Sequence, residues 1–232
     1  MVYFDADLLR FFRELAQNNE KPWFEANKER YLRSVKQPFE RFVMDFQRRV
    51  LELDPGFPPR KPAELIFRIH RDVRFSKDKS PYKTHAGAYF AAAGKTSQTA
   101  GFYIQLGPDD VQFWGGVWNL DKERLNIVRR HIVQNGEELN RLTASPEFAA
   151  VFKDVQGECV KNVPKEWADA PQSVWRWLKY KQFLYGAVLP AEICFSPRLM
   201  REAERHFLAA RPVNRFFNEA LFPAHRSAMN EF

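Results

Sequence analysis

Three short segments with the composition of β-strands lie close together in the middle of the chain, and they constrain its fold more than any other feature. They cover residues 88–91, 102–106 and 111–114, and turn-forming residues at 94–99 and 107–110 join them. Parallel neighbours would need crossover connections of about a dozen residues or more. Short turns between consecutive strands therefore predict an antiparallel meander.

A fourth segment, residues 67–75, alternates apolar and polar side chains, which is typical of a half-buried strand. Its apolar positions are Phe67, Ile69, Val73 and Phe75. Arg71 breaks the pattern, because it falls on the apolar face and needs either a nearby carboxylate or a ligand as its partner. Farther along, residues 178–183 are expected to form a strand or an edge segment.

Helical patterns precede and follow these strands. An apolar stripe over residues 8–15 follows the possible N-caps Asp5 and Asp7, and Asn18-Asn19 is expected to end that helix. Prolines suit the first turns of a second helix over residues 23–35 and of a third helix from residue 38. After the strands, helical spacing covers residues 121–134, 136–142, 146–152, 198–210 and 212–221.

This order of elements predicts an α+β protein with N-terminal helices, a central antiparallel meander sheet and C-terminal helices. We expect residues 1–195 to form a single α+β domain and residues 196–232 a helical C-terminal extension packed on it. The chain has 22 phenylalanines among its 232 residues, which argues against disorder. Seven of them are at core-facing spacings: Phe11, Phe12, Phe39, Phe42, Phe46, Phe67 and Phe75.

The cysteines and histidines argue against a metal site or a disulfide framework. Cys159 and Cys194 are too few and too far apart, and His206 and His225 lack the spacing of a zinc motif. We expect no metal and no cofactor. The absence of a long apolar run, together with the acidic N-terminal residues, predicts a cytoplasmic protein with no membrane partner. The sequence leaves the oligomeric state open.

The positive charge is concentrated in one short segment. The whole chain has a formal charge of +7, and residues 61–85 contribute seven basic and three acidic side chains, a net +4. Arginine, lysine and serine side chains of one strand and its following loop would suit a phosphate or a carboxylate, and an aspartate could orient an arginine. The candidate ligand-binding residues here are Arg68, Arg71, Asp72, Arg74, Ser76, Lys77, Lys79, Ser80 and Lys83.

Four further residues complete the hypothetical site. Tyr82 and His85 are the candidate catalytic residues, because a histidine can titrate near neutral pH and both side chains can transfer protons. Gly115 and Gly116 would close one side of the pocket, since paired glycines allow a backbone to approach a ligand, although they could equally mark a bulge at a strand end.

Several of these pieces resemble a bacterial family known only as domain-of-unknown-function family 2461. The likeness covers most of residues 8–190, and its most specific part is the run RDVRFSKDKSPYKTH at 71–85. Other matching pieces are Asn18-Asn19, Trp23-Phe24, Arg68, Gly115-Gly116, Trp118, the helix at 125–132 and Val163-Pro164-Lys165. The resemblance implies an α+β fold and no established activity.

Three functional hypotheses remain open at this point. The first is an enzyme or sensor that binds a small phosphorylated or carboxylated ligand at the basic segment. This hypothesis includes the option of acid–base catalysis. The second is a nucleic-acid-binding module, and the third is a structural or assembly protein whose charges form a salt-bridge lattice without catalysis. Aromatic and lysine side chains also interleave over residues 167–185, where core packing is the favoured interpretation. Asn19 is either part of a helix C-cap or an amide that reaches the basic segment.

Overall fold

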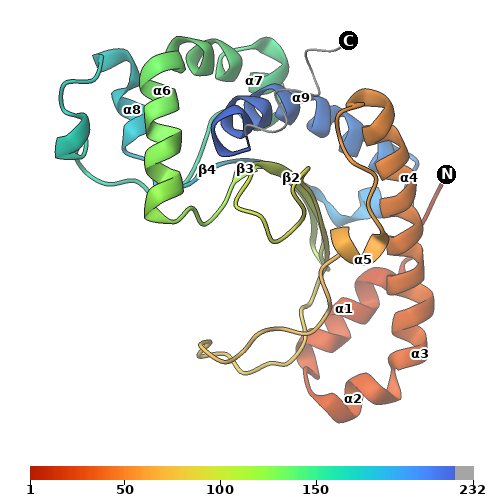
Figure 1. Cartoon of the computed structure of the whole chain (residues 1–232). Coiled ribbons are helices and arrows are strands. Elements are labelled where there is room, and N and C mark those ends of the chain that lie inside the picture. Colours follow the sequence, from red (N-terminus) through yellow and green to blue (C-terminus); the bar gives the residue numbers. More distant parts are fainter. Residues whose placement is uncertain (223–232) are drawn as a thin grey trace. The chain divides into compact units, whose positions relative to one another are not determined.

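Helices precede and follow a four-stranded antiparallel sheet, so the α+β prediction is confirmed (Figure 1). The computed structural model describes residues 1–222. Residues 223–232 of the expected C-terminal extension, including His225, lie outside this range.

The N-terminal helices bury an aromatic core. They are α1 (Asp7–Gln17), α2 (Lys21–Ala26), α3 (Lys28–Tyr31), α4 (Gln37–Leu53) and α5 (Pro62–Leu65). A π-helical turn, Leu32–Lys36, joins α3 to α4, because Pro38 has no N–H to donate to the turn before it. Five predicted core phenylalanines of α1 and α4 are at most 2% exposed: Phe11, Phe12, Phe39, Phe42 and Phe46.

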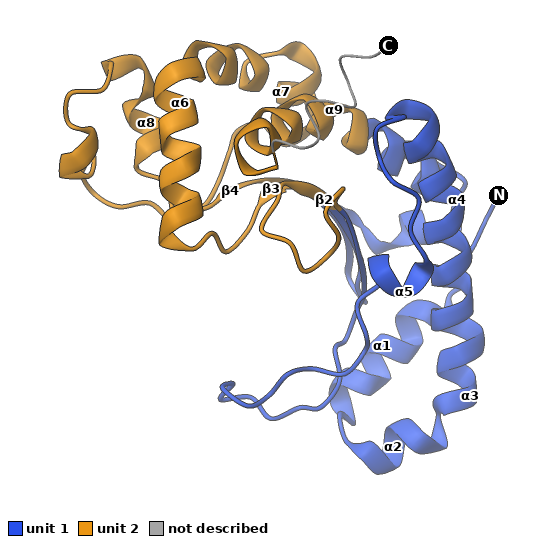
Figure 2. Cartoon of the chain, viewed as in Figure 1, with its two compact units in different colours: residues 1–90, 103–113, 188–205 blue, residues 91–102, 114–187, 206–232 orange. Residues whose placement is uncertain are grey.

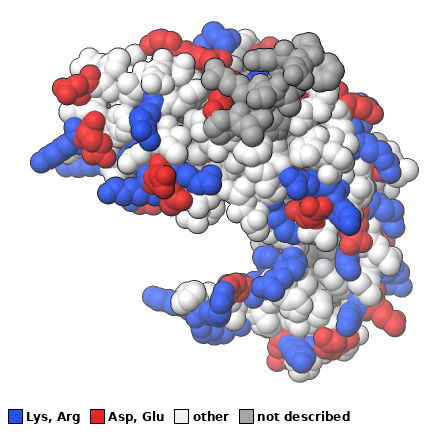
Figure 3. Space-filling view, viewed as in Figure 1, with Lys and Arg blue, Asp and Glu red and all other residues white. Residues whose placement is uncertain are grey.

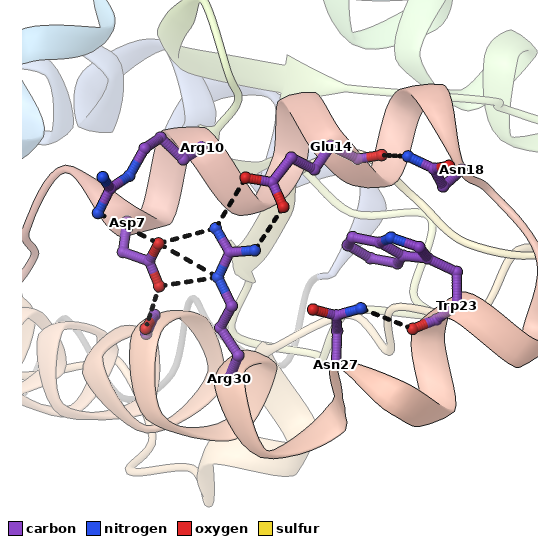
Figure 4. A network of polar contacts seen from close by, with 8 residues as sticks. Asp7, Arg10, Glu14, Asn18, Trp23, Asn27 and Arg30 are labelled. Atoms are coloured by element: carbon purple, nitrogen blue, oxygen red, sulfur yellow. Dashed lines mark hydrogen bonds and ion pairs between the residues drawn. The ribbon is translucent and has the colours of Figure 1, made fainter.

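An ionic network fastens α1 to α3 and to the π-helical turn after it (Figure 4). The Arg30 guanidinium donates to both oxygens of Asp7, at 3.0 Å from Nε and 2.8 Å from Nη2, and also pairs with Glu14. Ser34 Oγ donates to the same Asp7 carboxylate at 2.8 Å. These hydrogen bonds, with that from Arg30 the largest cause, lower the pKa of Asp7 to about 2. Because the charges are mutually paired, the network explains helix packing and leaves little capacity for a ligand.

The sheet contains the expected meander and one later strand. Its strands are β1 (Ala86–Phe90), β2 (Gly101–Leu106), β3 (Asp110–Val117) and β4 (Phe183–Pro190), in the spatial order β1-β2-β3-β4. The last strand begins where the expected strand or edge segment at 178–183 ends. The strand therefore starts later than expected. Residues Trp175–Leu178 form a short helix, α8, so the chain becomes extended only after it.

The predicted strand over residues 67–75 is wrong. One isolated antiparallel bridge, from His70 to Tyr82, occurs within these residues, and another, from Ile66 to Ala88, lies just before them. Pro81 in the opposing segment cannot donate to a ladder, so regular pairing does not extend along the hairpin. The core assignment of Phe75 is also wrong, since this side chain is 96% exposed beyond the last bridge.

Helices α6 (Lys122–Thr143) and α7 (Pro146–Phe152) follow the meander, and α9 (Arg198–Leu221) follows the last strand. Asp121 caps α6 by accepting a hydrogen bond from the Arg124 backbone at 2.8 Å. The helices expected at 121–134 and 136–142 are one element bent at Asn135, which has φ −128°. Those expected at 198–210 and 212–221 form the single helix α9 around Pro212, because burial of Ala210, Val213 and neighbouring residues outweighs one missing hydrogen bond.

The chain forms two compact units (Figure 2). Unit 1 contains residues 1–90, 103–113 and 188–205, and unit 2 contains residues 91–102, 114–187 and those from 206 onward. Strands β2, β3 and β4 and helix α9 contribute residues to both units. The expected division into residues 1–195 and a C-terminal extension stays a prediction.

Candidate functional site

The predicted basic segment forms an irregular hairpin in unit 1, here called the basic arm (residues 66–85), which extends away from the neighbouring helices (Figure 1). Its two sides are joined by backbone hydrogen bonds from Lys83 to Ile69 and from Arg71 to Pro81, both at 2.8 Å. Residues 72–80 form the tip beyond these bonds. Lys and Arg side chains cover much of the arm surface (Figure 3).

The base of the arm is fastened to the turn between α1 and α2. Asn19 Nδ2 donates to the Tyr82 carbonyl at 2.9 Å, and the Tyr82 N–H donates to Asn19 Oδ1 at 3.0 Å. The Tyr82 ring is 3% exposed and stacks on Phe24 with centroids 4.1 Å apart. The interpretation in which the second asparagine reaches the basic segment is therefore confirmed.

Two ion pairs form inside the tip. Arg71 pairs with Asp78, which also accepts from the Ser80 backbone at 2.9 Å. Arg74 contacts both oxygens of Asp72, at 3.0 Å from Nε and 2.7 Å from Nη2. Hydrogen bonds from Arg74 lower the pKa of Asp72 to about 2, and those from Ser80, followed by Arg71, lower the pKa of Asp78. Arg71 therefore has a carboxylate partner, which was one of the two alternatives.

Two lysines of the arm donate to backbone carbonyls, and two further cations lack a partner among residues 1–222. Lys79 Nζ donates to the Val73 carbonyl at 2.9 Å, and Lys83 Nζ donates to the Arg68 carbonyl at 2.7 Å. An ammonium has three N–H groups, so that of Lys79 retains donors for another acceptor. The side chains of Arg68 and Lys77 make no hydrogen bond or ion pair with any residue from 1 to 222. Six basic and two acidic side chains over residues 68–85 leave a net charge of +4.

The tip also exposes an aromatic ring that sequence reasoning assigned to the core. Phe75 is 96% exposed, and the Arg74 guanidinium carbon lies 5.9 Å from its ring centroid. Ser76 follows it, half-buried, with its N–H bonded to the Val73 carbonyl at 3.3 Å. The available sequence signal was the position of Phe75 between Arg74 and a polar, turn-forming run.

The two candidate catalytic residues have different surroundings. Burial is the main cause that raises the pKa of Tyr82, and its ring is enclosed between Phe24 and neighbouring groups. Burial, followed by the charge of Lys83, lowers the pKa of His85 and outweighs the opposite effect of Asp110. His85 is therefore favoured in its neutral form. A proton-transfer role for either residue stays a prediction.

The two glycines expected to close the site lie in unit 2, whereas the arm lies in unit 1. A Cβ atom on Gly115 would lie 2.2 Å from the Tyr185 ring, and one on Gly116 would lie 1.9 Å from the Phe183 carbonyl oxygen. Gly116 also has φ +109°, and its N–H donates to Asn214 Oδ1 at 2.8 Å. Close packing accounts for both glycines. The bulge at a strand end and the ligand-closing role, the two alternatives from the sequence, both stay predictions.

Three of the six aromatic residues at 167–185 are core residues, and the other three are half-buried. Trp177, Phe183 and Tyr185 are each 0% exposed. The Tyr185 hydroxyl donates to Asn214 Oδ1 at 2.6 Å, so its polar end is satisfied inside unit 2. These three rings are not available to stack on a ligand.

Two features are absent from the described residues. Within residues 1–222, no group of three or more His, Cys, Asp or Glu side chains could hold a metal ion. In the same range, no helix combines the length and the apolar character needed to cross a membrane.

Comparison with known proteins identifies a family but no described activity. No curated protein and no solved structure matches the chain. Residues 7–216, which include the N-terminal helices, the arm, the sheet and most of α9, match the family model described as "Conserved hypothetical protein (DUF2461)". The resemblance noted in the basic segment is thereby confirmed over most of the chain, and the protein belongs to the DUF2461 family.

Proposed function

We propose that the basic arm binds nucleic acid, with a preference for single strands. The observation that carries this proposal is the combination of an exposed ring with unpaired cations on one hairpin. Phe75 is 96% exposed beside Arg74, and the side chains of Arg68 and Lys77 are unpaired among residues 1–222. Exposed aromatic rings stack on unpaired bases, while lysine and arginine neutralise phosphates.

The openness of the arm favours this proposal over a pocket for a small ligand. Small-ligand sites are concave and bury most of the ligand surface. The Arg74 side chain is 76% exposed, and those of Asp72 and Asp78 are 50% and 60% exposed. An arm this open is suited to a long polyanion that contacts its cations side by side.

The charge balance argues against a purely structural lattice. A lattice pairs its charges, but the arm has four more basic than acidic side chains over residues 68–85. Its two carboxylates are already engaged by Arg71 and Arg74. The excess charge therefore remains available to a partner.

The anchored base supports recognition by a preformed arm. The two Asn19–Tyr82 hydrogen bonds and the buried Tyr82 ring fix where the arm leaves the helices. Less conformational entropy is then lost when a partner binds. Within the tip residues 72–80, the backbone N–H groups of Arg74 and Ser80 donate to the carboxylates of Asp72 and Asp78.

The salt dependence of binding tests the electrostatic part of the proposal. Fluorescence anisotropy with a labelled single-stranded oligonucleotide should give a dissociation constant that rises steeply with salt. Replacing Lys77, Lys79 and Lys83 by alanine should lower the slope of log K against log salt by about 2, since each lost phosphate contact contributes about 0.7. Alanine at the exposed Lys122, Lys161 and Lys165 of unit 2 removes the same charge and is the matched control.

Two results would contradict binding of nucleic acid by the basic arm. One is equal loss of affinity in both triple variants, which would mean that net charge and not the arm determines binding. The other is no binding at low salt combined with stabilisation by a small anion that is lost in Arg71→Ala and Arg74→Ala variants. That second result would favour the small-ligand hypothesis.

The stacking part is tested at Phe75. Phe75→Ala should weaken single-strand binding by about 1–3 kcal/mol, because one base loses its aromatic platform. Phe75→Trp should retain the affinity. Trp118→Ala is the control, because Trp118 is another exposed aromatic residue, 63% exposed, in unit 2. Equal binding by wild type and Phe75→Ala would remove stacking from the proposal.

A further inference from the structure

A second basic feature, in unit 2, is a buried arginine to which residues 1–222 supply no carboxylate partner. Arg129 on α6 is only 6% exposed. Its Nη2 donates to the Tyr180 carbonyl at 3.3 Å. Its Nε–H is enclosed and has no acceptor within residues 1–222, and no carboxylate of that range lies within 4.0 Å.

Such an arrangement is unusual for an arginine. Buried cations are paired or fully hydrogen-bonded, because an uncompensated charge in the interior is costly. Burial lowers the pKa of Arg129, and the attraction of Glu166 only partly opposes it. The attraction of Glu166 therefore does not compensate for the buried charge.

A second unsatisfied donor lies next to Glu166 in the chain. The Trp167 Nε1–H is enclosed and has no acceptor in the described part of the chain. The two other tryptophans of the same region differ from it in this respect. Trp175 Nε1 donates to the Ala170 carbonyl and Trp177 Nε1 to Asn140 Oδ1, both at 2.8 Å. Among these three tryptophans, only Trp167, the neighbour of Glu166 in the chain, therefore lacks an acceptor within residues 1–222.

We propose that unit 2 binds a small oxyanion at Arg129, with the indole N–H of Trp167 as a second donor. A guanidinium presents its N–H groups as a planar fork, which matches the paired oxygens of a carboxylate or a phosphate. The bound oxygens would accept from Nε and Nη of Arg129. This site is independent of the basic arm, which belongs to unit 1.

Thermal unfolding at constant ionic strength tests the site. Inorganic phosphate replaces chloride in one titration and acetate replaces it in another. Comparison of the two titrations shows whether the site prefers a phosphate or a carboxylate. The wild-type Tm should rise with the logarithm of the concentration of the preferred anion, since binding to the native state alone stabilises it. Arg129→Met should have a Tm that does not respond to either anion. Arg130→Met, at the exposed neighbouring position, should respond as the wild type does.

Further variants separate this site from the arm and from Glu166. The Lys77, Lys79 and Lys83 triple variant should keep the anion response, so the proposal can stand if nucleic-acid binding fails. If Arg129→Met does not fold, calorimetry on Arg129→Lys should show phosphate or acetate binding about 10-fold weaker, because the planar fork is lost. An unresponsive wild-type protein, or an identical response in Arg129→Met, overturns the proposal. So does a large loss of stability in Glu166→Gln without an anion effect, since Glu166 would then be the partner of Arg129.

Discussion

Replacing Gly116 by alanine is expected to lower the free energy of unfolding of the protein by about 3–5 kcal/mol. Two costs combine at this position. The backbone has φ +109°, which a residue with a Cβ atom adopts only with strain, and that Cβ atom would lie 1.9 Å from the Phe183 carbonyl oxygen. Since the obstacle is backbone of β4, it cannot be relieved by turning a side chain. Urea denaturation followed by circular dichroism measures the loss.

Gly94 supplies a matched control for this substitution. It also has a positive φ, +90°, but a Cβ atom there would meet nothing within 4 Å. Gly94→Ala should therefore lower the free energy of unfolding only through backbone strain, by about 1–2 kcal/mol. Equal losses for the two variants would show that close packing does not explain Gly116. The ligand-closing role suggested by its sequence would then regain support.

The regular elements were predictable because their signals are local. Helical apolar spacing around Phe11 and Phe42, and the short turns between consecutive strands, depend on neighbouring residues alone. The merging of two expected helices at Pro212 was not predictable in this way. A proline normally ends a helix, and burial of residues on both sides of it overrides that preference in the folded protein.

The arm shows where local pattern stops being sufficient. Residues 67–75 alternate as a strand does, but a strand also needs a partner that can complete the ladder, and Pro81 cannot donate. The ion pair of Arg71 with Asp78 spans seven residues and was foreseen as an alternative, whereas the exposure of Phe75 depends on how far the hairpin extends. Arg129 carried no signal in the sequence, because the missing partner of a buried cation is visible only in the fold.

Substitutions of Tyr82 distinguish an anchoring role of this residue from a proton-transfer role. The expected effect on the free energy of unfolding is large. Its ring is 3% exposed and stacks on Phe24, so Tyr82→Ala should cost about 3–5 kcal/mol of stability. Because Tyr82 lies at the base of the arm, exchange of the Arg71 and Lys83 amide hydrogens should also accelerate, as their acceptors lie within the same hairpin.

Tyr82→Phe is the control that keeps the ring and removes only the hydroxyl. If Tyr82 is an anchor, this variant should retain the stability, the amide protection of the arm and the oligonucleotide affinity of the wild type. The backbone bonds to Asn19 do not involve the side chain, so they persist in both variants and isolate the contribution of the ring. A small effect of Tyr82→Ala would contradict the anchor. Loss of binding in Tyr82→Phe at unchanged stability would instead show that the hydroxyl acts on the partner, because removal of one oxygen leaves the packing on Phe24 intact.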